Sequence, residues 1–104
     1  MNVDWLEPWC PVENARSLEQ ELTFEINSNY DHPLFGKKAV ALARRTDRDD
    51  VLFYLTDDKR FAVVHLTWNS ESSPDFPGTW FYSSLEDWVE KCMKPDYEDF
   101  HYGE

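Results

Sequence analysis

Glycine is scarce in this 104-residue chain, and its scarcity excludes several classes of enzyme. The three glycines, Gly36, Gly78 and Gly103, are isolated, so the chain has no glycine-rich loop to bind the phosphates of a nucleotide. No serine lies in a G-x-S-x-G setting, which excludes the nucleophile elbow of a hydrolase. The sequence therefore predicts no bound cofactor and contains no recognisable catalytic motif.

Cysteine is scarce as well. Cys10 and Cys92 are far apart and belong to no CxxC motif. We interpret both as free thiols in a reducing compartment, because a disulfide would require the two ends of the chain to meet. Cys10 lies between Trp9 and Pro11, an apolar setting that does not favour a reactive thiolate.

The chain also has no long hydrophobic run. The longest apolar stretch, at 61–68, is interrupted by His65 and Thr67, whereas a membrane-spanning helix needs about 20 mainly apolar residues. The first residues are acidic and are soon followed by Pro8, unlike a secretory signal, which begins with basic residues and an apolar stretch. We therefore expect a cytoplasmic protein that does not interact with membranes.

Lys and Arg are outnumbered by Asp and Glu, ten to 21, so the formal net charge at pH 7 is −11. The acids are concentrated at both ends: residues 1–36 carry a net −6, residues 37–60 a net +2 and residues 61–104 a net −7. A field of this sign repels nucleic acids and anionic lipids and attracts basic proteins. The basic residues of the middle section alternate between the faces of an expected strand, so they form no single anion-binding patch.

Residues 1–104 are expected to form a single domain, in which residues 1–10 are extended. Apolar residues recur every three or four positions over 11–26, which predicts an amphipathic helix beginning at Pro11. These residues are Val12, Ala15, Leu18, Leu22 and Ile26. Asn27 and the polar residues after it are poor helix formers and predict the end of this helix.

Three segments with the pattern of β-strands follow, at 38–44, 51–55 and 61–68. In the first, alanines alternate with larger side chains, which predicts one face lined only by small residues. Short polar turns join the three segments, so we expect an antiparallel meander. Residues 80–82 are expected to add a short fourth strand at an edge.

A second helix is predicted after Ser83, which forms a capping box with Glu86. Its apolar face comprises Leu85, Trp88, Val89 and Cys92. Pro95 is expected to end it, and residues 95–104 then form an acidic tail with three aromatic residues. The expected fold is α+β: an N-terminal helix, a three- to four-stranded antiparallel meander and a C-terminal helix, with both helices on one face of the sheet.

Four parts of the sequence form a pattern: ALARR at 41–45, DDVLF at 49–53, AVVHLTW at 62–68 and SLEDW at 84–88. This pattern resembles a set of small bacterial proteins of similar length that carry no assigned activity. The resemblance covers most of the chain. It implies a bacterial, cytoplasmic, single-domain protein and transfers no catalytic residue.

His65 is the residue best suited to chemistry, because a histidine on the open face of a sheet can act as a general base or bind a ligand. A pocket between sheet and helix is expected to include His65, Trp68, Tyr54 and Trp80. Strand alternation places Trp68 on the face opposite to His65. The competing interpretation is a structural histidine that bonds to a neighbouring strand.

No metal site is expected. His32 and His101 have no second histidine at helical spacing, as a helical zinc site would require. The turn at 47–50 is rich in aspartate, but it lacks the glycine and the distant glutamate of a calcium-binding loop. It is better interpreted as a solvated turn with local ion pairs.

Two functions of different classes fit these features. The favoured one is a non-catalytic interaction module for a basic protein, in one concrete form an immunity protein against a cationic toxin. The expected partner-binding residues are the acids of the first helix and the residues of the tail, namely Glu13, Glu21, Glu25, Asp96, Tyr97, Glu98, Asp99 and Tyr102. The alternative is a small-ligand-binding protein or small enzyme that uses the His65 pocket. A free strand edge and five Trp leave both monomer and homodimer open.

Overall fold

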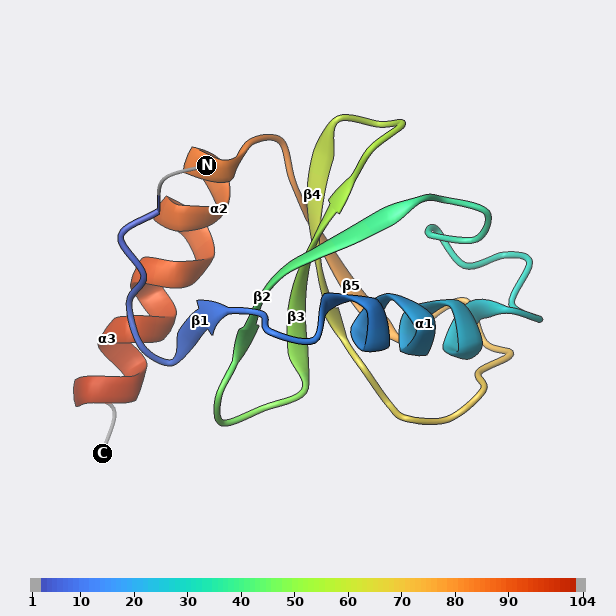
Figure 1. Cartoon of the computed structure of the whole chain (residues 1–104), viewed down its shortest axis with the longest axis horizontal. Coiled ribbons are helices and arrows are strands. Elements are labelled where there is room, and N and C mark those ends of the chain that lie inside the picture. The colour runs from blue at the N-terminus through green and yellow to red at the C-terminus, as the bar shows by residue number, and fades with distance from the viewer. Residues whose placement is uncertain (1–2, 103–104) are drawn as a thin grey trace.

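A computed structural model describes residues 3–102 as a five-stranded antiparallel sheet between two helical segments (Figure 1). The strands, which follow one another across the sheet in chain order, are β1 (Trp9–Pro11), β2 (Ala39–Arg45), β3 (Asp50–Leu55), β4 (Arg60–His65) and β5 (Gly78–Tyr82). Helix α1 (Ala15–Ile26) links β1 to β2. The C-terminal helix comprises α2 (Leu85–Trp88), a π-helical turn η1 (Val89–Met93) and α3 (Lys94–Tyr102). The predicted α+β class and the antiparallel meander are confirmed.

Each face of the sheet has its own hydrophobic core. Leu18, Leu22 and Ile26 of α1 pack with Leu34, Ala41, Val51, Phe53, Leu55, Ala62, Val64 and Leu66. On the opposite face, Trp88 and Met93 of the C-terminal helix pack with Trp9, Ala43, Leu52, Phe61 and Val63. The prediction that both helices share one face is therefore wrong. Residues 51–55 are all apolar or aromatic, so other elements must pack against both faces of β3 to bury these side chains.

A β-bulge in β2 changes the face on which its residues lie. Ala41 pairs with Phe53, whereas Ala43 pairs with the adjacent Leu52, so the register shifts by one residue at Leu42. As a result Ala41 contacts the core under α1 and Ala43 contacts the core under the C-terminal helix. The expected face lined only by alanines is therefore not formed, because strand alternation restarts after the bulge.

The N-terminal segment adds a fifth strand to the sheet. Cys10 pairs with Arg44, and the backbone N–H of Val12 donates to the carbonyl of Leu42 at 3.1 Å. Pro11 is the last residue of this edge strand, a position where a proline is tolerated. Helix α1 begins only at Ala15, so the prediction that Pro11 starts the helix is wrong. Residues 1–2 of the predicted extended segment lie outside the described residues.

The C-terminal helix begins at a cap one residue later than predicted. Ser84 Oγ accepts a hydrogen bond from the backbone N–H of Asp87 at 3.0 Å. Asp87 Oδ2 in turn accepts from the backbone N–H of Ser83 at 3.1 Å. The predicted capping box of Ser83 and Glu86 is therefore not formed. Ser84 is the cap, and Asp87 accepts from the residue before the cap rather than from the cap itself, as a capping box would require.

The helix does not end at Pro95. The backbone N–H of Lys94 donates to the carbonyl of Val89, five residues earlier, so the turn that precedes the proline is wider than an α-turn. A regular α-turn would bring the proline ring against the carbonyl four residues before it. The predicted acidic tail is therefore helical as far as Tyr102, and its last residues, 103–104, lie outside the described range. Within that range no helix is both long and apolar enough to span a membrane.

Candidate functional site

His65 forms a hydrogen bond to the neighbouring strand. It pairs with Asp50 across β3 and β4, and its Nδ1 lies 2.6 Å from Asp50 Oδ1. Half of the His65 side chain is exposed, whereas Asp50 is largely covered. A carboxylate held on Nδ1 fixes the orientation of an imidazole, and this arrangement serves both structural pairs and general bases.

Only part of the predicted ligand pocket comes together around this pair. Gly78 of β5 pairs with His65, and a Cβ atom built on Gly78 would lie 3.1 Å from Cη2 of Trp80, so the Trp80 ring covers Gly78. Trp80 is therefore near His65. Tyr54 lies four residues from Asp50 along β3, roughly 13 Å away at about 3.3 Å per residue. It lines a separate depression with Phe61 and Ser84.

Trp68 lies outside the strand that was expected to contain it. Strand β4 ends at His65, and Trp68 has a left-handed backbone with φ 62° and a side chain 51% exposed. Glu25 of α1 explains this break. Its Oε1 accepts the backbone N–H of Thr67 at 2.8 Å, and its Oε2 accepts that of Trp68 at 2.9 Å. The two amides therefore bond to a helix side chain rather than to a β-ladder.

Glu25 itself is fully buried, so it is not available to a partner protein as the sequence suggested. Besides the two amides it accepts the Thr67 hydroxyl at 3.2 Å, and its backbone carbonyl accepts the N–H of Glu71 at 2.9 Å. These bonds attach the loop at 66–77 to the end of α1. Glu25 therefore has a structural role.

Glu21 lies one helical turn before Glu25 and is affected by it. Burial, a hydrogen bond to Glu25 and the charge of Glu25 together raise the pKa of Glu21 to about 7. The Oε2 atom of Glu21 is buried, and no donor within residues 3–102 reaches it. A proton on Glu21 would remove this unpaired acceptor, so the two carboxyl groups carry less charge near neutral pH than the sequence implies.

The tail residue Asp96 is also directed into the molecule. Its Oδ2 accepts the indole N–H of Trp9 at 2.8 Å and lies 3.3 Å from Nη1 of Arg45. Arg45 is buried and also donates two hydrogen bonds of 2.9 Å to Asp47. Asp96 therefore joins α3 to β1 and β2 and has little surface left for a partner.

The remaining predicted partner-binding residues do not form one surface. Glu13, Glu98, Asp99 and Tyr102 are exposed, and Tyr97 is partly covered with its ring 4.3 Å from His101. Figure 1 shows α1 and α3 on opposite sides of the sheet, so the acids of the first helix and those of the tail are separated. The prediction of one surface built from both is therefore wrong, because it assumed that the helices lie on the same face.

Cys10 and Cys92 are both free. Burial and the nearby Asp96 raise the pKa of the Cys92 thiol to about 12. A thiol with this pKa stays protonated at neutral pH and is a poor nucleophile. Within residues 3–102, no three His, Cys, Asp or Glu side chains are grouped so that they could hold a metal ion.

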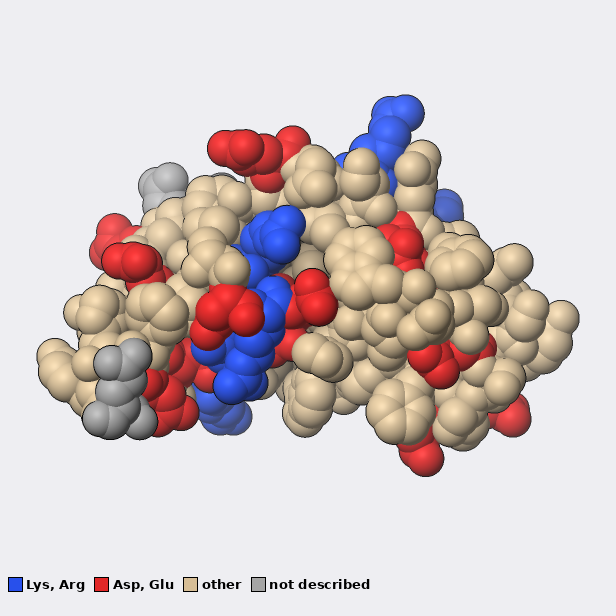
Figure 2. Space-filling model, turned by 90° about the horizontal axis from the view of Figure 1, so that it is seen from below, with Lys and Arg blue, Asp and Glu red and all other residues tan. Residues whose placement is uncertain are grey.

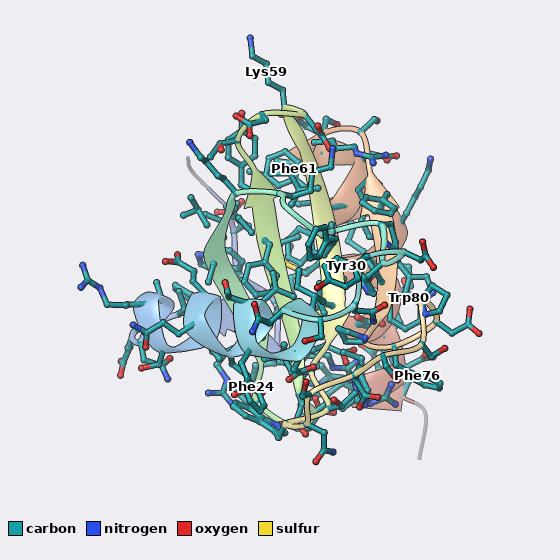
Figure 3. The ribbon with its side chains drawn as sticks, turned by 90° about the vertical axis from the view of Figure 1, so that its right-hand side faces the viewer. Phe24, Tyr30, Lys59, Phe61, Phe76 and Trp80 are labelled. Carbon is teal, nitrogen blue, oxygen red and sulfur yellow. The ribbon has the colours of Figure 1, made fainter. Side chains whose placement is uncertain are left out.

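A set of exposed aromatic side chains lies at the end of the molecule formed by α1, β5 and the loops at 27–38 and 66–77. This aromatic surface comprises Phe24, Tyr30, Phe35, Trp68, Phe76 and Trp80. It extends around the edge of the sheet, because Phe24 lies on α1 whereas Trp80 pairs with Val63, which belongs to the core on the opposite face. In the end-on view of Figure 3, Phe24 lies on α1, and Phe76 and Trp80 lie towards the opposite, β5 side of the sheet. Aromatic residues that occur singly in loops form no periodic pattern. Of these six residues, the sequence therefore identified only Trp68 and Trp80 as candidate site residues.

Buried polar side chains hold the two loops of this surface together. Asn29 Nδ2 donates to the carbonyls of Ser73 and Phe76 at 2.6 and 2.8 Å. His32 Nδ1 accepts the backbone N–H of Leu34 at 3.0 Å, so the proton on its ring lies on Nε2, which donates to the Pro77 carbonyl at 2.8 Å. The aromatic side chains are therefore presented by a fixed frame.

Most of the exposed rings lie in residues 27–36 and 66–82, which contain acids but no Lys or Arg. The acids of these two stretches are Asp31, Glu71 and Asp75. Lys37, which follows the first segment, is paired with Asp58 at 3.0 Å, and Lys59 lies away from Phe76 and Trp80 in Figure 3. In Figure 2, many of the basic side chains gather in a central strip beside Asp and Glu, with mostly uncharged residues to its right.

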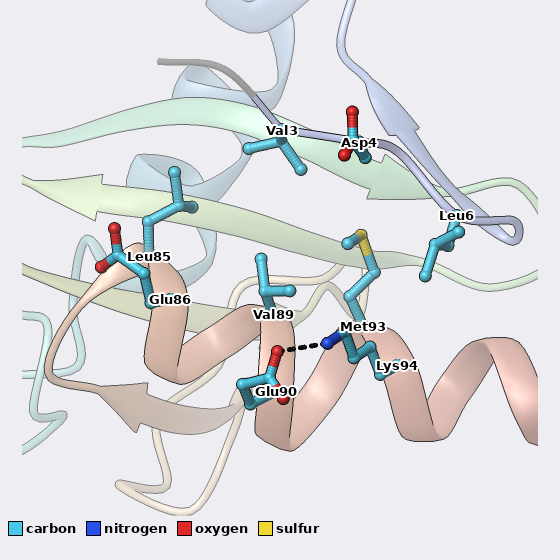
Figure 4. Close-up of a pocket in the computed structure, with 9 residues that line it drawn as sticks. All are labelled: Val3, Asp4, Leu6, Leu85, Glu86, Val89, Glu90, Met93 and Lys94. Carbon is cyan, nitrogen blue, oxygen red and sulfur yellow. Dashed lines mark ion pairs between the residues drawn. The ribbon is translucent and has the colours of Figure 1, made fainter.

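A shallow cavity of about 340 Å³ lies elsewhere, between the N-terminal segment and the C-terminal helix (Figure 4). Val3, Leu6, Leu85, Val89 and Met93 supply its apolar lining, and Asp4, Glu86, Glu90 and Lys94 its charged groups. Glu90 and Lys94 neutralise each other in an ion pair one helical turn apart.

Comparison with protein-family models, with curated proteins and with solved structures gives no match to this chain. Its function is therefore inferred from its own geometry.

Proposed function

We propose that this protein is a non-catalytic interaction module that binds a basic protein through the aromatic surface. One observation carries this proposal: most of the exposed aromatic side chains lie in two stretches, 27–36 and 66–82, that contain acids but no Lys or Arg. We place the protein in the bacterial cytoplasm, where neutralising a cationic toxin is one concrete role for such a module.

The exposure of the rings supports a binding role. Tyr30 is 75% exposed, and Phe76 and Trp80 are each 54% exposed. Large aromatic side chains are enriched at the centres of protein interfaces, where they bury area at a small entropic cost. The buried bonds of Glu25, Asn29 and His32 fix the loops in advance, so binding does not have to order them.

The charge supports a basic partner in particular. A net charge of −11 attracts basic proteins over long range and increases their rate of association. The same charge opposes binding to nucleic acids and anionic lipid surfaces. A mixed aromatic and acidic surface also suits Lys and Arg, whose side chains stack on rings and pair with carboxylates.

A pull-down from bacterial lysate with the tagged protein tests this function. We expect a basic protein to be captured at about 0.05 M NaCl and lost at about 0.3 M, since salt screens charge attraction. A Tyr30→Ser/Phe76→Ser variant should lose this partner. A Tyr102→Ser variant, which removes an equally exposed ring from α3, should retain it. Equal capture by both variants, or capture that is independent of salt, would contradict the proposal.

The second candidate is a small-ligand-binding protein or small enzyme at His65. The Asp50–His65 hydrogen bond of 2.6 Å and the nearby Trp80 favour it, because they orient a half-exposed imidazole beside an aromatic ring. NMR screening of a fragment library against the wild type and His65→Gln would test it. Ligands that shift Trp80 and are lost in His65→Gln would support this function, and the absence of any such ligand would count against it.

A further inference from the structure

The outer side of β5 is a free strand edge. In the sheet order β1 to β5, β4 is the only strand neighbour of β5 within residues 3–102. The backbone N–H of Leu66 donates to the carbonyl of Asp49 at 3.0 Å, so residues 62, 64 and 66 direct their backbone groups towards β3. Residues 61, 63 and 65 therefore bond to β5.

This alternation identifies the free backbone groups of β5. Trp80 lies opposite Val63 and bonds towards β4, so Thr79 and Phe81 direct their N–H and C=O groups away from the sheet. Within residues 3–102, no group forms a hydrogen bond with these outward N–H and C=O groups. The hydrogen bonds of Thr79 outside the β4 ladder are made by its side-chain hydroxyl. A strand that pairs with these groups would extend the sheet.

The β5 edge lacks the features that usually protect an edge strand. Its sequence, GTWFY, has no charged residue and no proline, and its pairing with β4 is regular, without a bulge. The other edge strand, β1, is short and ends in Pro11. An unprotected edge next to an exposed Trp80 is a site where extended peptides bind by strand addition.

We propose that the free edge of β5 binds an extended basic segment of the partner protein, which pairs with Thr79 and Phe81 and lies against Trp80. The proposal rests on the proposed function and states how the partner binds. The charge around the edge favours a basic occupant: residues 66–82 contain no Lys or Arg, and Glu71 and Asp75 lie in the loop that leads into the strand. Arg60, the nearest base, lies over the Phe81 ring, 3.9 Å from its centroid, and pairs with Asp58.

A second copy of this chain is a poor occupant of the same edge. Pairing of two β5 strands would bring together two molecules that each carry a net charge of −11 and whose strands are flanked by the same acids. Charge repulsion therefore disfavours a homodimer through β5. A segment with alternating Lys and β-branched residues combines the right charge with a high tendency to form a strand.

Peptide binding and amide exchange test the proposal. The probes are a fluorescent ten-residue peptide of alternating Lys and Val, and a matched peptide of alternating Glu and Val. We expect the basic peptide alone to bind, and the exchange rates of the Thr79 and Phe81 amides to fall by about tenfold or more when it is bound. Thr79→Pro, which removes one outward N–H, should weaken binding by about tenfold, and Tyr102→Ser should not change it.

The outcomes separate the binding mode from the proposed function. If the basic peptide does not bind, or binds while both amides exchange as in the free protein, strand addition is overturned. The proposed function then stands or falls on the pull-down. If the two amides are protected without peptide and sedimentation shows a dimer, the occupant is a second copy and the basic segment is overturned. The exchange measurement on the wild type decides the question even if Thr79→Pro fails to fold.

Discussion

Glu25 shows how one buried carboxylate determines the path of a loop, because three donors of Thr67 and Trp68 converge on it. We expect Glu25→Ala to lower the free energy of unfolding by about 2–4 kcal/mol, since the substitution leaves three partly buried donors without an acceptor and a cavity where the Glu25 side chain was. Urea unfolding measures the loss, and faster exchange of the Thr67 and Trp68 amides locates it. Glu13→Ala, at an exposed acid, is the control and should change stability by less than about 0.5 kcal/mol.

Glu21 predicts a pH dependence with a definite sign. Folding raises its pKa from 4.5 to about 7, so the folded state holds the proton more tightly than the unfolded state. Its contribution to stability is therefore complete below about pH 4.5 and is lost as the pH rises through 7. Glu21→Gln, which cannot ionise, should be more stable than the wild type at pH 8, by about 1 kcal/mol for this partly solvated group. The difference should vanish near pH 5, and an equal difference at both pH values would refute the assignment.

At the residue scale, helical spacing predicts that Glu25 is buried, although its charge suggests an exposed residue. Glu25 lies three residues after Leu22 and seven after Leu18, which places it on the buried face of α1. Because it is charged, Glu25 was nevertheless predicted to be a partner-binding acid on the surface of the first helix. The fixed tautomer of His32 and the bonds of Asn29 depend on contacts between loops distant in the chain, which no local pattern predicts.

At the scale of elements, the C-terminal helix depends on Asp96 for its docking. Asp96 accepts from Trp9 and pairs with Arg45, both of which are buried. We expect Asp96→Ala to destabilise the fold by about 2–3 kcal/mol, because it leaves a buried cation with one partner fewer. Glu98→Ala, two residues later and exposed, is the matched control. Equal unfolding midpoints for the two variants in urea would show that the Asp96 contacts do not stabilise α3.

The meander was predictable because short polar turns join strands whose apolar patterns are clear. Three features of the elements were not. Strand β1 has only three residues, and its pairing with β2 is a tertiary contact. The bulge at Leu42 leaves no local mark, and Pro95 is accommodated by a π-turn that sequence rules for regular α-helices do not include.

At the scale of the whole molecule, the net charge predicts opposite effects of salt on stability and on binding. Self-repulsion among acids destabilises the folded state at low ionic strength. Raising NaCl from about 0.02 to 0.3 M should therefore raise the midpoint of thermal unfolding by a few degrees while it weakens partner binding. Differential scanning calorimetry measures the first effect. A constant or falling midpoint would show that the acids do not repel one another in the folded state.

The fold class followed from the sequence, whereas the candidate surface did not. The order of helix and strands fixed an α+β domain, but assigning both helices to one face joined acids that lie on opposite sides of the sheet. The aromatic surface depends on where two loops meet. That meeting is determined by Glu25, Asn29 and His32 together, so it required the tertiary structure.

The core beneath the C-terminal helix is assembled from segments far apart in the chain. Trp9 and Asp96, 87 residues apart, bond to each other, and Trp88 and Met93 pack in the same core as Trp9. A ribosome makes the chain from its N-terminus, and domains fold as units during or after synthesis. The sheet face that carries Leu52, Phe61 and Val63 is therefore uncovered until Trp88 and Met93 have been made and have left the ribosome. During that interval the nascent chain exposes a hydrophobic face to solvent, which is the kind of surface that chaperones bind.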